Sequence, residues 1–464
     1  MLDIEPDLSD RLFSDFDFSN GAVAAVSGGS DSTALLLLLK HHLERTLPAA
    51  KLLAVTIDHA LRPNSAAEAQ AVARLCAEHG IAHRTLVWSD RKPSTGLPAA
   101  AREARYRLLA EAAEAEGIRV VVTGHTADDQ AETVLMRQAR DRGTRDERAY
   151  DDRGLAGMAP ATLYGWRTWI ARPLLSTRRA ALREMLKRRG VGWIEDPTNV
   201  DQRFERPRMR VSLAGGDGEA RFTQAIAKAG QAAAERAELG RRAAVLIGAF
   251  ASRPAPGLIR LDRAFADGED SEAARYALRI LLATVGGVSF LADEARCRAL
   301  FERLRSGTLC ATLSRTVVDA RRTGIFLHRE ARNLPTTIPA EDQILWDGRR
   351  RITLSDRPDG LVIAPVGAVA ARRSAPEGDV PASLLRRALA AEPALWRDGE
   401  RLDSAGGGVA PPPMAIVPVV SPFASFLPSF DLRPAAAVAK LIGAPPLPPL
   451  PFRGHDRDGA WAKA

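Results

Sequence analysis

Short apolar runs alternate with longer segments of helical periodicity in the first part of the chain. The apolar runs predict β-strands over Ala22–Val26, Lys51–Ile57, His83–Trp88 and Arg119–Val122. The segments that follow them predict helices over Ser32–Leu43, Ser65–His79, Leu97–Glu116 and Ala127–Arg140. Such alternation is typical of a doubly wound parallel sheet with helices on both faces. We therefore predict an α/β fold for this part.

Polar residues follow each of the predicted strands. The strand ends carry Ser27-Gly28-Gly29, Asp58-His59, Ser89-Asp90 and Thr123-Gly124-His125. Ligands in open α/β sheets bind at the carboxyl ends of the strands. We therefore expect the functional site along this edge of the sheet.

A different pattern begins at the glycine-rich segment Ala214–Gly218, which we interpret as a hinge. The segment Glu219–Ala251 is rich in Ala, Arg and Glu and predicts one long helix, in which Gly240 is the position where an interruption would fall if there is one. Two further helices and a hairpin are predicted over Ser271–Ala283, Asp293–Leu304, Thr312–Asp319 and Gly324–His328.

The last part of the chain, from Pro335, has β-like runs of poor periodicity. Flexible or extended segments are predicted at Gly406–Gly408, Pro411–Pro413 and Pro445–Pro451. We therefore expect a catalytic α/β domain over residues 1–213 and a mostly helical domain with a short hairpin over 214–334. A smaller, mixed and partly flexible C-terminal region follows over 335–464.

The composition is that of an ordinary soluble protein of two or three domains, with 464 residues, 46% of them hydrophobic and 26% charged. Residues 1–17 are acidic and contain no apolar core, so we expect no signal peptide there, and we expect no transmembrane segment because the apolar run Leu35–Leu39 is too short. Cys76, Cys297 and Cys310 form no Cys-x-x-Cys pair. Three scattered cysteines fit a reducing cytoplasm and argue against structural zinc or an iron–sulfur cluster.

The positive charge is concentrated in one segment. Between Arg137 and Arg210 there are 18 Arg and Lys against 10 Asp and Glu, which equals the net charge of +8 of the whole chain. A basic segment beside a nucleotide-binding turn indicates a polyanionic partner, with nucleic acid as the natural candidate. An arginine-rich solvated surface is the alternative on charge alone.

The turn between the first predicted strand and helix has the composition of a phosphate-binding loop. Its glycines, Gly28 and Gly29, allow close approach of an anion, and the helix N-terminus points N–H groups at it. Hydroxyl donors are supplied by Ser27, Ser30, Ser32 and Thr33. No Lys follows the glycines, which excludes a Gly-x4-Gly-Lys-Ser/Thr loop. Asp31 would repel a bare phosphate, so its role is to hold Mg²⁺ or to move a proton.

Two further helices carry candidate chemistry. Arg102, Arg105 and Tyr106 share one helix face, where paired guanidiniums suit a phosphate or carboxylate, although a solvated helix explains them in isolation. In the second helix, Asp129 and Glu132 recur at helical spacing after His125. Carboxylates beside a histidine can bind an ammonium group or accept its proton. A well-capped helix is the alternative for this second group.

A strip of arginines ends the basic segment, with Arg203, Arg206, Arg208 and Arg210 surrounding Phe204. Arginines that bind phosphates beside an aromatic that stacks on a base indicate a nucleic-acid contact. We expect Pro207 to interrupt any helix in this strip.

Taken in order, these motifs resemble those of the tRNA(Ile)-lysidine synthetase family, a branch of the N-type ATP pyrophosphatases with the loop Ser-Gly-Gly-x-Asp-Ser. Residues 20–212 carry the resemblance. Besides the loop, the matching segments are Asp58–Arg62, Ala101–Leu109, Gly124–Thr133, Gly154–Met158, Arg172–Leu175 and Glu195–Asn199. One departure is the charged insert at 141–153, where the family pattern has a compact Arg-Gly-Ser-Gly turn.

The resemblance implies a fold similar to the adenine nucleotide alpha hydrolases and a two-step reaction. ATP adenylates the 2-oxygen of the wobble cytidine in the CAU anticodon of tRNA(Ile), and pyrophosphate leaves. The side-chain amine of free L-lysine then displaces AMP to give lysidine, which converts AUG to AUA decoding and Met to Ile identity. The implied partners are this tRNA and lysine, with no membrane, and the oligomeric state, a homodimer included, stays open.

The resemblance also implies roles for individual residues. ATP binding falls to Ser27, Gly28, Gly29, Ser30, Asp31 and Ser32. Asp31, Arg105 and His125 are the implied catalytic residues, with Asp31 also the Mg²⁺ contact. Lysine binding falls to Asp129 and Glu132. Contact with tRNA, through which the helical domain would also act, falls to Arg203, Arg206, Arg208 and Arg210.

Three other functions compete with this one. A tRNA-thiolating relative would need a reactive cysteine pair or cluster ligands, which the scattered cysteines do not supply. An amidotransferase relative would need a Cys/His constellation that hydrolyses glutamine or another source of ammonia, and no Cys/His constellation in this sequence offers one. A non-catalytic tRNA-binding protein would be expected to lose the loop, His125 and Glu132, and all are intact. ATP hydrolysis that depends on tRNA would distinguish an enzyme from a binder.

Overall fold

The structure is a computed structural model that describes residues 6–62, 64–143, 152–195, 203, 205–339, 343–354, 360–374, 380–402 and 414–452. The chain forms two compact units, one of residues 1–236 with 448–464 and the other of residues 237–447. The first unit therefore extends beyond the domain end expected at residue 213. Its boundary falls within a long helix, because the first turns of that helix pack on the α/β domain.

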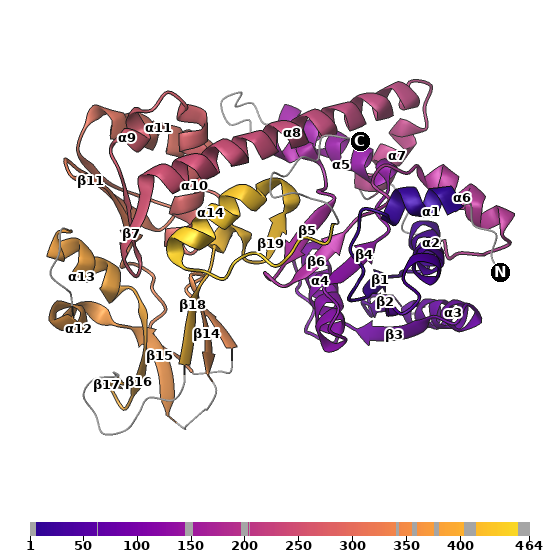
Figure 1. Ribbon diagram of the computed structural model, residues 1–464, viewed down its shortest axis with the longest axis horizontal. Helices are drawn as coiled ribbons and strands as arrows, with labels where there is room; N and C mark the ends of the chain where they lie inside the picture. Colours follow the sequence, from indigo (N-terminus) through magenta and orange to yellow (C-terminus); the bar gives the residue numbers. More distant parts are fainter. Residues whose placement is uncertain are drawn as a thin grey trace. The chain divides into compact units, whose positions relative to one another are not determined.

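The first unit is built on a mostly parallel sheet (Figure 1). Its strands are β1 (Ala22–Ala25), β2 (Leu52–Asp58), β3 (Ala82–Val87), β4 (Val120–Thr123), β5 (Ala161–Tyr164) and β6 (Thr168–Ala171). They lie in the order β5-β6-β4-β1-β2-β3, and only β5 runs antiparallel to its neighbour β6. The predicted α/β fold with a parallel sheet is confirmed.

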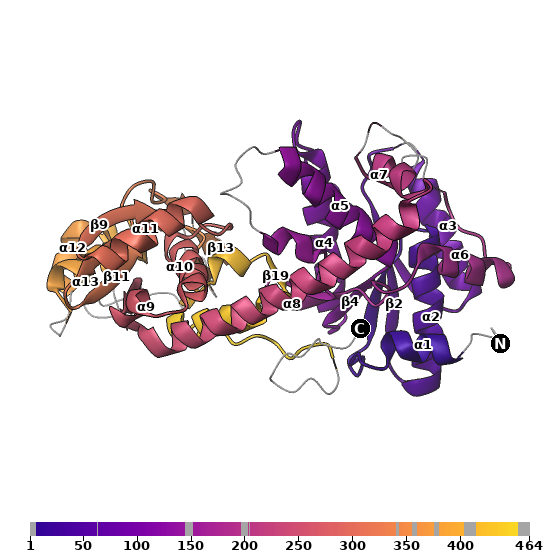
Figure 2. The same ribbon diagram turned by 90° about the horizontal axis from the view of Figure 1, so that it is seen from above.

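Helices cover both faces of this sheet, since the strands run between α2 and α4 (Figure 2). The helices that begin in this unit are α1 (Pro6–Phe13), α2 (Ser30–Thr46), α3 (Ser65–Glu78), α4 (Leu97–Ala115), α5 (Ala127–Gly143), α6 (Arg179–Arg188), α7 (Glu205–Leu213) and α8 (Gly218–Phe250). The run Leu35–Leu39 of α2 is buried because this helix contacts β1, α1 and α6. A leucine-rich helix placed between a sheet and other helices needs this apolar surface all round.

The proline-rich segment near the C-terminus is extended and packs on the first unit. The Trp169 indole donates to the Pro449 carbonyl at 2.8 Å, and the rings of Phe16 and Phe452 lie 4.9 Å apart. These contacts explain why the segment after residue 447 belongs to the first unit.

Two local expectations are wrong. Helix α8 continues through Gly240, where a Cβ would lie 3.2 Å from Pro434 Cδ, so this glycine permits close packing. Pro207 does not interrupt a helix but lies in the first turn of α7. The first turn tolerates proline because its N–H groups have no partner within the helix.

The second unit begins with the end of α8 and an antiparallel sheet in the order β7-β8-β11-β10-β9. These strands are β7 (Ala251–Ala255), β8 (Leu258–Leu261), β9 (Leu309–Leu313), β10 (Thr316–Arg321) and β11 (Gly324–Arg329). The helices are α9 (Ala264–Asp267), α10 (Ser271–Gly286) and α11 (Glu294–Ser306). The expected hairpin is present as β10 and β11. The run predicted as one strand over Thr312–Asp319 instead turns at Ser314 and Arg315, both with positive φ.

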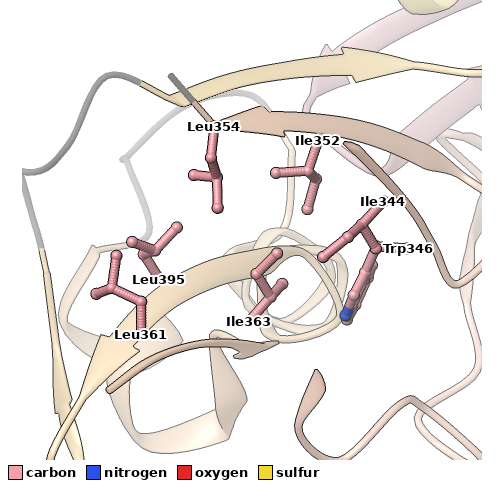
Figure 3. Close-up of a cluster of buried hydrophobic side chains, with 7 residues drawn as sticks. All are labelled: Ile344, Trp346, Ile352, Leu354, Leu361, Ile363 and Leu395. Atoms are coloured by element: carbon pink, nitrogen blue, oxygen red, sulfur yellow. The ribbon is translucent and has the colours of Figure 1, made fainter. Parts of the chain in front are cut away.

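The remainder of the second unit contains two small antiparallel sheets. One has the order β12-β15-β16-β17 and the other β13-β14-β18. Their strands are β12 (Ile338–Pro339), β13 (Gln343–Trp346), β14 (Arg350–Leu354), β15 (Leu361–Pro365), β16 (Pro393–Arg397), β17 (Glu400–Arg401) and β18 (Met414–Pro418). Side chains of β13 and β14 face those of β15 and β16 and form a buried core that includes Trp346 (Figure 3).

The other elements of this unit are α12 (Gly367–Ser374), α13 (Ala382–Ala390), β19 (Phe426–Pro428) and α14 (Leu432–Ile442). Across the described parts of both units, we find no helix that is both long and apolar enough to span a membrane.

Candidate active site

The phosphate-binding loop joins β1 to α2, as the sequence predicts. Gly28 has a φ of +81°, and a Cβ there would lie 2.5 Å from Ile194 Cδ1. The backbone N–H of Ile194 also donates to the Gly28 carbonyl at 2.8 Å. Only glycine fits this conformation and this contact without strain. The segment around Ile194 therefore supports the loop from outside.

Hydrogen bonds within the loop fix its shape. The Ser32 hydroxyl accepts from the Ser27 N–H at 3.2 Å and donates to the Gly29 carbonyl at 3.1 Å. The Ser30 hydroxyl donates to Asp31 Oδ1 at 3.0 Å. Gly29 is the N-cap of α2, so the first N–H groups of this helix lack partners within the helix. They are available to an anion, as expected of a pyrophosphate site.

Gly124 brings a second strand end against this loop. A Cβ on Gly124 would lie 2.9 Å from the Ser32 N and 3.0 Å from the Asp31 carbonyl oxygen. The end of β4 therefore packs directly on the first turn of α2. This contact places His125 and the start of α5 beside the loop.

A single arginine joins three carboxylates at this edge of the sheet. Arg179, at the start of α6, donates through Nε to Asp31 Oδ2 at 2.8 Å and through Nη2 to Asp129 Oδ1 at 3.0 Å. Its Nη1 reaches Glu132 Oε1 at 3.4 Å. These carboxylates raise the pKa of Arg179, although burial opposes the shift. Sequence reasoning missed Arg179, which lies 148 residues from Asp31 in the chain.

The two residues expected to bind lysine are buried on α5. The side chain of Glu132 is 1% exposed, and its Oε2 has no hydrogen-bond partner among the described residues. Asp129 Oδ2 accepts from the backbone N–H of Thr126 at 2.9 Å. Burial opposes ionisation of Asp129, but Arg179 and the Thr126 N–H hold its pKa below the usual value. Asp129 is therefore held ionised, and Glu132 beside it has one oxygen that accepts no hydrogen bond from the described residues.

His125 is held as a neutral imidazole. Its pKa lies well below the usual value because it is buried and because Arg172 and Arg105 are near. The Thr123 hydroxyl lies 2.9 Å from His125 Nδ1 and donates to the Ala171 carbonyl at 3.3 Å. Because the hydroxyl proton is used there, Nδ1 must donate to Thr123. This assignment leaves Nε2 with a lone pair that can accept a proton.

The arginines near His125 differ in their environment. Arg172 is 4% exposed and donates to the Ala159 carbonyl at 2.7 Å and to the Thr162 hydroxyl at 3.0 Å, so it supports the fold. Arg105 has no carboxylate partner among the described residues. Burial and the nearby Arg102 lower the pKa of Arg105, although Tyr106 opposes them. An anion bound beside Arg105 would remove this unfavourable electrostatic situation.

The expected tRNA-binding arginines divide into two groups. Arg203 and Arg208 are exposed, and Arg208 donates to the Arg203 carbonyl at 3.0 Å. Arg210 instead donates from Nε to Glu132 Oε1 at 2.7 Å, and Arg206 Nε lies 4.0 Å from Glu132 Oε2. The structure thus brings Arg206 and Arg210 to the carboxylates expected to bind lysine.

Arg183 is a second residue that sequence reasoning missed. It lies one turn after Arg179 on α6, and its Nε donates to the Ser30 hydroxyl at 3.2 Å. Its Nη2 also pairs with Glu195 Oε1 at 3.2 Å. The signal that could have found both arginines is their spacing of four residues at the start of a helix. Phe204, residues 196–199 and most of the charged insert lie outside the described residues.

Within the described residues, no group of three or more His, Cys, Asp or Glu side chains is arranged to hold a metal ion. Asp31 is the one carboxylate of the loop, its side chain is 17% exposed, and the Ser30 hydroxyl donates to it. Oxygen donors of this kind suit Mg²⁺, which takes few protein ligands and completes its shell with phosphate and water.

Comparisons with known proteins agree with this geometry. The PP-loop domain family matches residues 7–215, which include every predicted site residue. A tRNA(Ile)-lysidine synthase of Mesorhizobium japonicum is 66% identical over 99% of this chain and 100% of its own length. Those of Rhizobium meliloti and Brucella anthropi are 39% and 38% identical over 92% and 85% of this chain, and 93% and 88% of their own lengths.

Full-length similarity at this level, together with an intact phosphate-binding loop, leaves one assignment. This chain belongs to the tRNA(Ile)-lysidine synthase family.

Proposed function

We propose that this protein is an ATP-dependent ligase that joins free L-lysine to the 2-position of the wobble cytidine in the CAU anticodon of tRNA(Ile). One observation carries the proposal. Arg179 connects Asp31 of the phosphate-binding loop to Asp129 and Glu132, so a nucleotide site and an ammonium-binding site share one edge of the sheet. The relatives named as tRNA(Ile)-lysidine synthases support the substrates.

In the first step, the 2-oxygen of cytidine attacks the α-phosphorus of ATP, and pyrophosphate leaves. The N–H groups at the start of α2 and the Ser27 and Ser30 hydroxyls bind the pyrophosphate portion. Arg105, which lacks a carboxylate partner among the described residues, would neutralise charge that develops on the phosphate. Stabilisation of the departing anion is what the loop contributes to the rate.

Asp31 would hold Mg²⁺ in this step. When bound, the ion would neutralise phosphate charge and stabilise the leaving pyrophosphate. Asp31 Oδ2 is engaged by Arg179 and Oδ1 by Ser30 in this structure. The carboxylate would therefore exchange part of its contact with Arg179 for the metal. Proton transfer by Asp31 is the alternative role.

In the second step, the side-chain nitrogen of lysine attacks C2 of the adenylated cytidine, a C–N bond forms, and AMP leaves with the former 2-oxygen. Glu132 and Asp129 bind the lysine through its ammonium groups. The attacking amine must first lose a proton, and His125 Nε2 is the acceptor with a free lone pair. Phosphate bound near Arg105 and Arg172 would raise the pKa of His125 and make it a better base.

Nucleoside mass spectrometry on CAU-anticodon tRNA(Ile), incubated with the protein, ATP, Mg²⁺ and mixed amino acids, tests the proposal. The expected product is cytidine that has gained lysine. It should disappear when lysine or ATP is omitted. Pyrophosphate release with unmodified cytidine would reassign the nucleophile. Neither product nor pyrophosphate from folded protein would contradict the proposal and favour a non-catalytic tRNA binder.

A further inference from the structure

The second unit contains a buried ionic cluster that the proposed reaction does not use. Asp347, in the turn between β13 and β14, is fully buried and pairs with Arg329 Nε at 3.0 Å and Arg349 Nε at 2.8 Å. Arg315 pairs with the same carboxylate. Asp347 is therefore shared by three guanidiniums.

A second carboxylate continues the cluster. Glu392 Oε1 accepts from Arg349 Nη1 at 2.9 Å, and Oε2 accepts from Arg350 Nε at 2.7 Å. Gly257, with a φ of +72°, makes room for it, because a Cβ there would lie 2.6 Å from Glu392 Oε1. The turn between β7 and β8 thus closes over the Glu392 carboxylate.

A pocket opens beside these pairs. The pocket is small and open to solvent, and its charged lining consists of Arg253, Arg349 and Arg350. Arg253 is exposed on β7 and makes no hydrogen bond or ion pair with any described residue. The other lining groups are apolar except for Thr284, whose hydroxyl is already donated to the Ile280 carbonyl at 2.8 Å. The available donors are therefore guanidinium N–H groups.

The charges of this region do not balance. Four guanidiniums pair with the carboxylates of Asp347 and Glu392, and Arg253 adds a fifth positive charge that no carboxylate of the described residues pairs with. None of the residues that line the pocket is a carboxylate. The side chains of Arg349 and Arg350 are only 2% and 11% exposed, so water screens them little. Burial and the neighbouring Arg349 and Arg253 lower the pKa of Arg350, although Glu392 opposes them. Buried cations in excess of their partners are costly unless a bound anion compensates them.

We propose that this pocket is a second anion site, separate from the phosphate-binding loop, that takes a phosphate group between Arg253 and Arg350. A phosphate matches the fork of donors on a guanidinium, and it brings one negative charge as a phosphodiester and up to two as a free ion. The group belongs either to a free phosphate ion or to an RNA backbone, and both present at least two non-bridging phosphate oxygens that can accept from a guanidinium. The proposal does not depend on the reaction assigned above.

Hydrogen exchange of the full-length protein tests the site locally. The readout is the backbone of peptides covering 251–261 and 346–352, which frame the pocket. In the first arm, the exchange rates of these peptides are compared in inorganic phosphate and in chloride at equal ionic strength. In the second arm, they are measured with and without an RNA oligonucleotide that lacks terminal phosphates. The expected result is slower exchange in these peptides, saturating with the concentration of the bound species.

Arg253→Gln is the decisive variant, because its side chain is exposed and has no partner to lose in folding. In this variant, the phosphate or RNA that slows the exchange should bind about tenfold more weakly, as expected for the loss of one charge-assisted contact. Arg332→Gln, with a side chain that is 86% exposed and outside the pocket lining, should leave it unchanged.

Protection by inorganic phosphate that is weakened in Arg253→Gln identifies a free-ion site, and protection by RNA alone identifies a backbone-phosphate site. No protection in either arm, or equal affinity of Arg253→Gln and the unchanged protein, would overturn the proposal.

Discussion

Individual side chains divide the proposed reaction into two parts. Asp31 belongs to the phosphate-binding loop, whereas Glu132 lies on α5 with one oxygen that has no hydrogen-bond partner among the described residues. Their link is Arg179, which touches both. Although the two carboxylates share a cation, they face different substrates in the proposed reaction. This division can be tested by removing each charge in turn.

Asp31→Asn should abolish pyrophosphate release, because the neutral amide can neither hold Mg²⁺ nor accept a proton. Glu132→Gln should leave pyrophosphate release nearly intact and raise the KM for lysine by roughly tenfold to a hundredfold, the usual cost of one charged hydrogen bond. Both are measured by tRNA-dependent pyrophosphate release and by lysine titration. Glu219→Gln, whose side chain is 75% exposed, serves as the control. Equal loss of pyrophosphate release in both variants would contradict the division.

The sequence predicts this site unevenly, for a physical reason. Gly28, Asp31 and Ser32 are readable because a phosphate-binding loop is a local structure whose residues are contiguous. His125, Asp129 and Glu132 are readable because a strand end and a helix face bring them together within eight residues. The sequence does not predict Arg179 and Arg183 as site residues, because they contact their partners only after the chain has folded back across the sheet. For the same reason, Arg210 was expected at the tRNA and is found against Glu132.

At the level of helices and strands, the site depends on how closely β4 approaches α2. Gly124 lies at the end of β4 with its α-carbon against the backbone of Asp31 and Ser32. No side-chain chemistry is involved in this contact. The glycine sets the spacing between the phosphate-binding loop and the helix that carries the carboxylates.

Gly124→Ala should therefore separate the two elements. The added Cβ would meet the Ser32 N at 2.9 Å, and overpacking of this kind costs about 1–3 kcal/mol of unfolding free energy. We expect a lower melting temperature and a larger loss in the rate of pyrophosphate release than stability alone explains. Gly192→Ala is the matched control, since nothing lies within 4 Å of a Cβ there. Identical activity of both variants would show that the spacing is unimportant.

Periodicity explains which elements the sequence predicts well. Helices α2 to α5 and strands β1 to β4 repeat a simple apolar pattern and were expected within a few residues. The two small sheets after Pro335 were not, because their strands pair across long separations, as Arg350 does with Pro418. The strands are also short, two to five residues each, so an alternating pattern has few positions in which to show.

On the scale of the whole molecule, the basic segment between Arg137 and Arg210 lies within the first unit, and the second unit has its own arginine pocket. Both the basic segment and the arginine pocket fit a polyanionic substrate such as tRNA. Each bound phosphate releases counterions from the nucleic acid, so binding weakens as salt rises.

Replacing Arg206 and Arg208 by Ala should weaken tRNA binding and flatten its salt dependence. The slope of log affinity against log salt should fall by roughly 0.7 for each single-stranded phosphate contact that is lost. Filter binding over a salt series measures it, with Arg188→Ala, a side chain that is 64% exposed on α6, as the control. Unchanged affinity across the series would remove the strip from the tRNA interface.

The pairing of Arg210 and Arg179 with Glu132 and Asp129 has a consequence for selectivity. Each carboxylate already pairs with a guanidinium in this structure, so in the proposed reaction the lysine ammonium would displace a guanidinium rather than bind to an unpaired carboxylate. The net affinity for lysine then depends on what the displaced guanidinium binds next, and a tRNA phosphate would stabilise it better than water does. Such a site resists stray amines and inorganic cations in the absence of RNA. The selectivity of the site for lysine over other cations would then be a property of the complex with tRNA rather than of the protein alone.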